Sequence, residues 1–161
     1  MIRIADALLE LRPGAEWSID NNSYSQLDWL DTKQTKPTEE ELVRKIAEIE
    51  YQEEVNEYQR QRSAEYPSYA DQFDKIFHEG VDAWKADIQA IKDKYPKATI
   101  DADVLKEKQD KAVDNWTYNK QLRDYVNAVA ILESDPDEET RAAAQAIIDS
   151  TPNSIVDSIN N

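Results

Sequence analysis

The chain contains one histidine, and the residues around it are the natural place to look for chemistry. His78 lies in the stretch EYPSYADQFDKIFHEG, residues 65–80, together with Asp71 and Asp74. In a helix these three side chains stand at i, i+3 and i+7 and therefore share one face. Two carboxylates beside an imidazole could bind a metal ion or transfer protons. The predicted face is solvated, however, and offers too few ligands for a closed metal site.

The same stretch also has the features of one complete helix. Ser68 is a good N-cap, and Asp71 stands three residues later, where a carboxylate can accept a hydrogen bond from the N-cap backbone N–H. His78 falls in the last turn, where the helix dipole favours a cation, and Gly80 supplies the stop. We therefore expect Ser68, Asp71, His78 and Gly80 to be structural residues.

The apolar residues of this helix recur at helical spacing and are expected to form its buried stripe. They are Tyr69, Phe73, Ile76 and Phe77. A second helix, carrying apolar residues from Trp84 to Tyr95, follows after Gly80. Because the connection is so short, the two helices are expected to pack as a helical hairpin.

Composition argues against other kinds of active site. The chain has no cysteine, which excludes disulfides, thiolate chemistry and cysteine-based zinc sites. With two glycines it cannot form a glycine-rich phosphate loop, and no glycine-flanked serine accompanies the single histidine. We therefore predict a protein that is not an enzyme, with no catalytic residue, no metal site and no cofactor.

Charge and hydropathy limit the partners. The chain of 161 residues has 34 acidic and 19 basic residues and a formal net charge of −15. Such a chain is poorly suited to bind the phosphates of nucleic acid, which attract lysine and arginine. No apolar run approaches the roughly 20 residues of a membrane span, and MIRIADALLELRPG lacks the long apolar run of a secretory signal. We expect no nucleic-acid or membrane partner, and a cytosolic site of synthesis or assembly.

Hydrophobic spacing predicts a mainly α fold, with helical hairpins or a bundle and a small N-terminal β-hairpin module. The module, residues 1–36, combines a helix over 3–11 with strands around Trp17 and Trp29 that are joined at Asn21-Asn22. Residues 37–97 hold a long helix capped by Thr38 and Glu41, and then the helical hairpin. Residues 98–161 form a C-terminal helical region, with a long helix over 101–133 and a further helix capped by Asp135 with Pro136 at its first position.

Aromatic residues are the candidates for partner contacts. Trp17, Tyr24 and Trp29 lie on the small hairpin module, which can bury them only if the neighbouring helices cover one of its sides. They form either a mini-core or an exposed docking patch. The same two alternatives apply to Tyr51, Tyr58 and Tyr66 along the long helix.

Two stretches resemble proteins of tailed bacteriophages. ALLELRPGAEWSI…NNSYSQLDWLD…KPTEEEL, within residues 7–42, resembles the N-terminal module of XkdW-like proteins, which are encoded among tail and tail-fibre genes. EYQRQRSAEYPSYADQFDKIFHEGVDAWKADIQAIKDKYPK, residues 57–97, is similar to a segment of small phage proteins with the pattern YPSxxDQxDxxxHxG…YPK. The resemblance implies a place in a phage tail but no activity, cofactor or catalytic residue, and it does not extend to residues 98–161.

The leading hypothesis is therefore a virion structural or accessory protein of the tail or tail fibres, assembled in the host cytoplasm. It would contact other tail or fibre proteins, as a homo-oligomer or as part of a larger assembly. One alternative is a fibre-assembly chaperone that does not stay in the virion. A remote alternative is an acidic DNA mimic that inhibits a host enzyme. Lysines interleaved along the helices, such as Lys85, Lys92 and Lys106, argue against the unbroken acidic rows that such a mimic needs.

Overall fold

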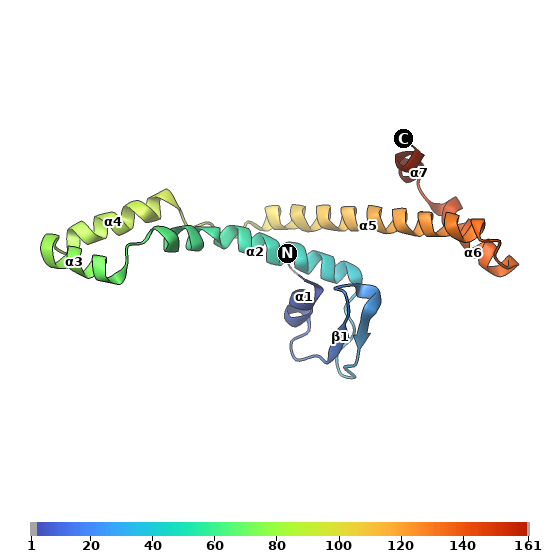
Figure 1. Cartoon of the computed structure of the whole chain (residues 1–161), viewed down its shortest axis with the longest axis horizontal. Helices are drawn as coiled ribbons and strands as arrows, with labels where there is room; N and C mark the ends of the chain where they lie inside the picture. Colours follow the sequence, from blue (N-terminus) through green and yellow to red (C-terminus); the bar gives the residue numbers. More distant parts are fainter. Residues whose placement is uncertain (1–2, 161) are drawn as a thin grey trace. The chain divides into compact units, whose positions relative to one another are not determined.

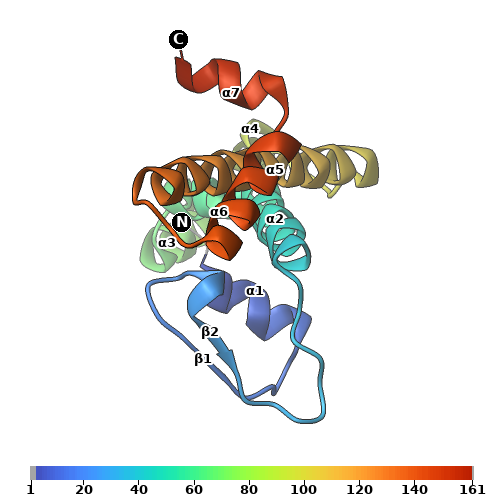
Figure 2. The same cartoon turned by 90° about the vertical axis from the view of Figure 1, so that its right-hand side faces the viewer.

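The structure, a computed structural model, describes residues 3–160 and is mainly α-helical with one small antiparallel β-hairpin (Figures 1 and 2). The predicted fold class is therefore confirmed. The elements in chain order are α1 (Ile4–Leu11), β1 (Trp17–Ile19), a 3₁₀ turn (Tyr24–Gln26), β2 (Leu27–Trp29), α2 (Glu39–Glu65), α3 (Tyr69–Glu79), α4 (Val81–Lys94), α5 (Ala102–Glu133), α6 (Glu138–Ser150) and α7 (Asn153–Asn160). The chain divides into two compact units, Met1–Lys108 and Gln109–Asn161, with the boundary inside α5.

The N-terminal unit has its core where α1 and the hairpin meet the first turns of α2. Figures 1 and 2 both show α1 and the strands grouped on one side of this end of α2. Ala7, Leu8, Leu27 and Leu42 are buried there, and the side chains of both strands pack around them. Because α1, β2 and α2 each contribute to this core, the short module is held by its neighbours rather than by its own few residues.

The hairpin follows the predicted pairing. Trp17 lies opposite Trp29, and the pairing between β1 and β2 is antiparallel. Asn21 and Asn22 both have positive φ angles, 51° and 52°, as their place in the turn predicts. The connection is longer than a two-residue turn because a 3₁₀ turn follows, and the Asn22 side chain accepts a hydrogen bond at 2.7 Å from the backbone N–H of Ile4 at the start of α1.

Helix α2 begins with the predicted capping box. The Thr38 hydroxyl accepts a hydrogen bond from the backbone N–H of Glu41 at 3.1 Å, and the Glu41 carboxylate accepts one from the backbone N–H of Thr38 at 2.7 Å. Arg12, just past the end of α1, pairs with the same carboxylate at 3.3 Å. The start of α2 is thereby tied to the end of α1.

Helices α3 and α4 form the predicted helical hairpin. Gly80, with φ of 88°, is both the end of α3 and the N-cap of α4. Lys75 pairs with Asp87 across the hairpin at 2.6 Å, and Trp84 Nε1 donates to the Gln72 side chain at 3.0 Å. The face of α3 that contacts α4 is therefore the one that carries Gln72 and Lys75.

The expected burial of the aromatic stripe on α3 is wrong. Tyr69, Phe73 and Phe77 are 82%, 69% and 84% exposed, although Ile76 is partly covered. Residues spaced i, i+4 form rows along a helix, and α4 covers the row with Gln72 and Ile76. The aromatic row lies beside it and stays largely exposed. Periodicity identified an apolar face but could not show what covers it.

The C-terminal unit is held together by a few contacts among α5, α6 and α7. Ala128, Ala144 and Ile155 are buried, and the hydroxyls of Tyr118 and Ser158 lie 2.8 Å apart. The cap of α6 differs from expectation, because Asp137 accepts the hydrogen bond from the Thr140 backbone N–H.

Asp135 instead adopts a positive φ of 53° and forms the turn before α6. Pro136 therefore precedes the N-cap rather than occupying the first helical position. Two carboxylates stand two residues apart in DPDE, and the local pattern alone did not decide which of them caps the helix.

The first turns of α5 belong to the N-terminal unit, so the compact boundary lies later than residue 98. The Tyr51 hydroxyl accepts a hydrogen bond from the Asp101 backbone N–H at 3.2 Å, and Lys108 pairs with Glu54 at 2.7 Å. These contacts join residues about fifty positions apart in sequence, beyond the reach of the local patterns used to divide the chain.

Candidate docking surface

His78 and the nearby acidic residues do not converge on a site. His78 Nε2 lies 3.4 Å from a carboxylate oxygen of Asp74, and both side chains are largely exposed. The Asp71 carboxylate instead accepts a hydrogen bond from the Ser68 hydroxyl at 2.6 Å. The His78 ring meets the Phe77 ring edge-on, with centroids 5.0 Å apart. Within residues 3–160 no group of three metal-ligating side chains could hold an ion.

Ser68 is the N-cap of α3, as its sequence position predicts. Its hydroxyl accepts a hydrogen bond from the Asp71 backbone N–H at 3.2 Å and donates one to the Asp71 carboxylate. We expected the Asp71 carboxylate to accept a hydrogen bond from the N-cap backbone N–H, and this is wrong. It accepts one from the Ser68 hydroxyl instead. Asp71 thus supports the cap by orienting the hydroxyl.

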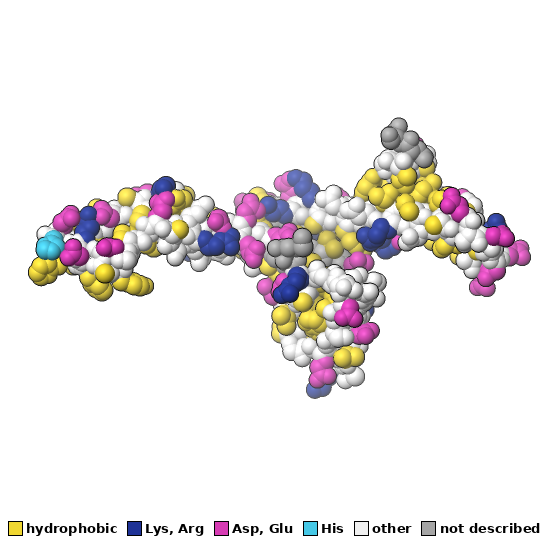
Figure 3. All heavy atoms as spheres, viewed as in Figure 1, with side chains coloured by type: hydrophobic (Ala, Val, Ile, Leu, Met, Phe, Trp, Pro, Cys, Tyr) yellow, Lys and Arg dark blue, Asp and Glu magenta, His cyan; other side chains and the backbone are white. Residues whose placement is uncertain are grey.

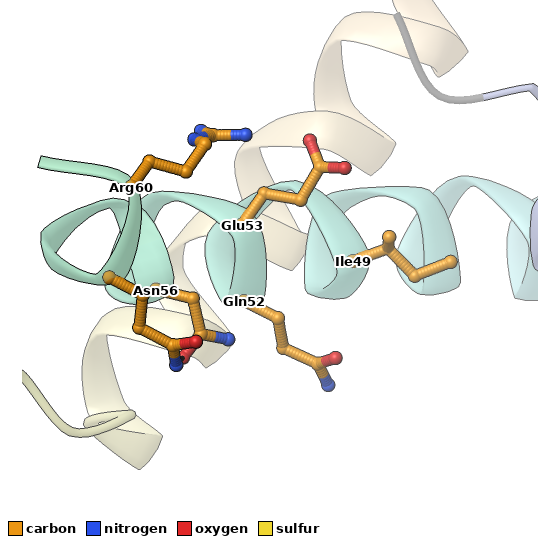
Figure 4. A pocket seen from close by; sticks show the side chains of 6 residues that line it. Ile49, Gln52, Glu53, Asn56 and Arg60 are labelled. Carbon is orange, nitrogen blue, oxygen red and sulfur yellow. Dashed lines mark hydrogen bonds between the residues drawn. The ribbon is translucent and has the colours of Figure 1, made fainter. Parts of the chain in front are cut away.

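The charged side chains elsewhere are also at least partly open to solvent. Within residues 3–160, no side chain of the polar and charged residue types is buried. One groove of about 280 Å³ is lined by six residues of α2 alone, among them Glu53, Asn56 and Arg60 (Figure 4). These side chains spread along one helix instead of pointing to a common centre, and Arg60 is paired with Glu57.

Three of the candidate contact aromatics take part in the N-terminal core. Trp17, Tyr24 and Trp29 are partly buried against it. The Trp29 indole N–H donates to the Gln34 carbonyl, and the Tyr24 hydroxyl donates to the Pro37 carbonyl, each at 2.9 Å. Burial, with Glu39 and Glu41 nearby, raises the pKa of Tyr24. These residues hold the connector to the hairpin, and a partner role for them stays a prediction.

The tyrosines of α2 have separate surroundings. Tyr51 is buried, and the Lys108 ammonium lies 5.2 Å from its ring centroid. Tyr58 is partly covered, with the Arg62 guanidinium 4.9 Å from its ring centroid. Tyr66 is half-buried at the end of α2. The structure thus brings Tyr51 and Tyr58 against cations of this chain, and their contact with a partner also stays a prediction.

The exposed aromatic row of α3 is the clearest candidate for a docking surface. Tyr69, Phe73 and Phe77, here named the α3 stripe, follow one another at i, i+4 and i+8. Figure 3 shows hydrophobic side chains gathered at the α3 end of the view, with acidic ones beside them. Exposed phenylalanine and tyrosine in a continuous row are typical of protein interaction sites. This row was missed because the sequence pattern placed it in the core.

A groove extends the apolar surface from the stripe. It has a volume of about 460 Å³ and is lined by Tyr69 together with Tyr66, Trp84 and Ile88. Lys92 is the one charged residue of its lining and lies near α2, where its carbonyl accepts a hydrogen bond from Arg62 at 3.1 Å. Because Tyr69 belongs to both the stripe and the groove, the two form one surface.

The sequence did contain one sign of this arrangement. In α3 the row of Tyr69, Phe73 and Phe77 lies beside the row of Gln72 and Ile76, and one neighbouring helix can cover only one such row. Helix α3 is joined to α4 through Gly80 and to α2 through residues 66–68, so once α4 packs on one row the second row needs another element to bury it.

Comparison with protein-family models, curated proteins and solved structures finds no match to this chain. None of the helices described here is long and apolar enough to cross a membrane.

Proposed function

We propose that this chain is a structural or accessory protein of a bacteriophage tail or its fibres, acting through protein–protein contacts. The observation that carries the proposal is the α3 stripe, three aromatic side chains 69% to 84% exposed on one helix face. Leaving such a surface in water is unfavourable, at about 25 cal/mol per Å² of apolar area. A partner that covers the stripe gains this free energy on binding.

The sequence resemblance of residues 57–97 supports the same assignment. The stripe, its N-cap Ser68 and the stop at Gly80 all lie inside the stretch that resembles small phage proteins. This stretch therefore combines a phage-like sequence pattern with the most exposed aromatic surface of the described residues.

Mass spectrometry of gradient-purified phage particles tests the proposal. The expected result is that peptides of this chain are present at a constant ratio to the major tail protein. A chain found bound to fibres in infected cells but missing from finished particles would be an assembly chaperone. If it is absent from both particles and fibre complexes, the proposed function is wrong.

A further inference from the structure

We propose that the α3 stripe is the docking site for a basic, amphipathic segment of a partner protein. The inference rests on the proposed function and deepens it by naming the chemistry of the partner. Three features carry it: the area of the stripe, the charges at its free edge, and the way this chain already binds lysine on aromatic rings.

The area fits a single segment better than a second copy of the chain. Aromatic side chains bury about 150–250 Å² each, so the three partly exposed rings offer roughly 500 Å². A stable interface needs about 800 Å² per partner, so two stripes face to face would fall short. A helix or strand that follows the stripe into the adjoining groove gains the additional area at Tyr66 and Trp84.

Charge at the free edge of the stripe selects a basic partner. One edge of the stripe adjoins the row of α3 that contacts α4. The other edge is free of such contact, and Asp74 lies there. Asp74 stands three residues before Phe77 and is therefore its neighbour on the helix. The Asp74 side chain is 76% exposed and pairs with His78 at 3.4 Å. With a net charge of −15, a second copy of this chain is repelled and a basic segment is attracted.

The chain itself shows how aromatic rings and carboxylates together bind a lysine. Lys108 lies 5.2 Å from the Tyr51 ring centroid and 2.7 Å from the Glu54 carboxylate, and Tyr51 and Glu54 stand three residues apart on α2. Lys94 lies over the Tyr95 ring at 5.0 Å and pairs with Glu65.

The stripe and Asp74 offer the same two kinds of group three residues apart, in the reverse order along the helix, with Asp74 before Phe77. Among residues 3–160, no lysine or arginine lies over the rings of Tyr69, Phe73 or Phe77. A lysine or arginine of the partner would place its aliphatic stem on a ring and its charge at Asp74.

Two designed peptides test this inference with the purified full chain. The first is a helix of about 18 residues with leucines on one face and lysines on the other, and the second has glutamate in place of every lysine. Fluorescence anisotropy of the labelled peptides measures binding. We expect the lysine peptide to bind, with an affinity that falls as salt is raised, and the glutamate peptide not to bind.

Variants locate the binding site. Phe73→Ser with Phe77→Ser should weaken binding of the lysine peptide at least tenfold, roughly the effect of losing an aromatic hot spot. Asp74→Lys should weaken binding and reduce its salt dependence. The matched controls are Leu9→Ser with Leu30→Ser, two other exposed apolar residues, and Asp114→Lys, another exposed aspartate. Controls are expected to bind as the unchanged chain does, and circular dichroism checks that each variant is folded.

Three results would overturn the inference. If the two peptides bound equally, the partner segment would not need to be basic. If the stripe variant and the Asp74 variant both bound as the unchanged chain does, the peptide would bind at another surface. Self-association in sedimentation equilibrium that the stripe variant abolishes would make a second copy the occupant. Each of these is measured on purified protein, so it is distinct from failure of the proposed function, which is absence of the chain from particles and fibre complexes.

Discussion

Asp31, Glu41 and Asp137 each accept hydrogen bonds from backbone N–H groups where the chain enters a turn or a helix. The N–H groups of Gln34 and then Lys33 lower the pKa of Asp31. The N–H of Thr38 is the main cause that lowers the pKa of Glu41. The Thr140 N–H does the same for Asp137. At the scale of single residues, these three carboxylates organise the backbone next to them.

Two of these carboxylates predict how the N-terminal unit responds to acid. Asp31 and Glu41 have lowered pKa values in the folded state, so their stabilising contribution is complete above about pH 4.5, near their unfolded pKa values. It is lost as the pH falls through the lower folded values. Urea unfolding at a series of pH values, followed by the fluorescence of Trp17 and Trp29 in a chain with Trp84→Phe and Trp116→Phe, measures this.

The control for this pH prediction removes the two titrating groups. With Asp31→Asn and Glu41→Gln in the same background, the loss of unfolding free energy below about pH 4.5 should be smaller. An equal loss with and without these substitutions would assign the acid sensitivity to other groups.

A second prediction at this scale concerns the stretch with the single histidine. Ser68→Ala removes both hydrogen bonds of the α3 cap and should cost about 1 kcal/mol of local stability. His78→Ala should change it by less than about 0.5 kcal/mol, because the His78 side chain is 64% exposed. Hydrogen exchange of the Gln72 amide measures both, and a larger effect at His78 than at Ser68 would contradict the structural role given to each.

At the scale of elements, the sequence predicted what is decided locally. The Thr38 and Glu41 cap, the positive φ of Asn21 and the stop at Gly80 depend on neighbours a few residues away, and all three are observed. The burial of Phe73 could not be predicted in this way, because it depends on which other element covers that face of α3. The helical hairpin was foreseeable, and the sequence could show that α4 covers only one row of α3 but not which row stays exposed.

At the scale of elements, we predict that truncating a core residue lowers the free energy of unfolding much more than truncating a residue of the α3 stripe. Leu42 is buried between α1, the hairpin and α2, so Leu42→Ala should lower the free energy of unfolding of this unit by about 2–5 kcal/mol. Phe73→Ala removes a larger side chain but should change stability by less than about 0.5 kcal/mol, because Phe73 is 69% exposed. Chemical denaturation of the two variants measures both effects. A comparable loss for Phe73→Ala would mean that the stripe is part of the core.

For the whole molecule, the contacts that define the units join distant parts of the chain. Tyr51 with Asp101, and Glu54 with Lys108, attach the first turns of α5 to the N-terminal unit. Such pairs carry no local signature in the sequence, so local patterns could not show how far each compact unit extends. The C-terminal unit keeps Val126 and Ile147 partly exposed, so apolar surface is left open in both units.

The last prediction follows from this distribution and from the proposed function. A phage that encodes the chain with Phe73→Ser and Phe77→Ser should make normal amounts of soluble protein, because the stripe does not support the fold. Its purified particles should contain at least tenfold less of the chain than particles with the Leu9→Ser and Leu30→Ser control, since attachment loses its aromatic contacts. Quantitative mass spectrometry of particles and of infected-cell lysate measures both amounts. Unchanged content in the particles would show that the chain attaches through another surface, and the open apolar residues of the C-terminal unit would then be the next to test.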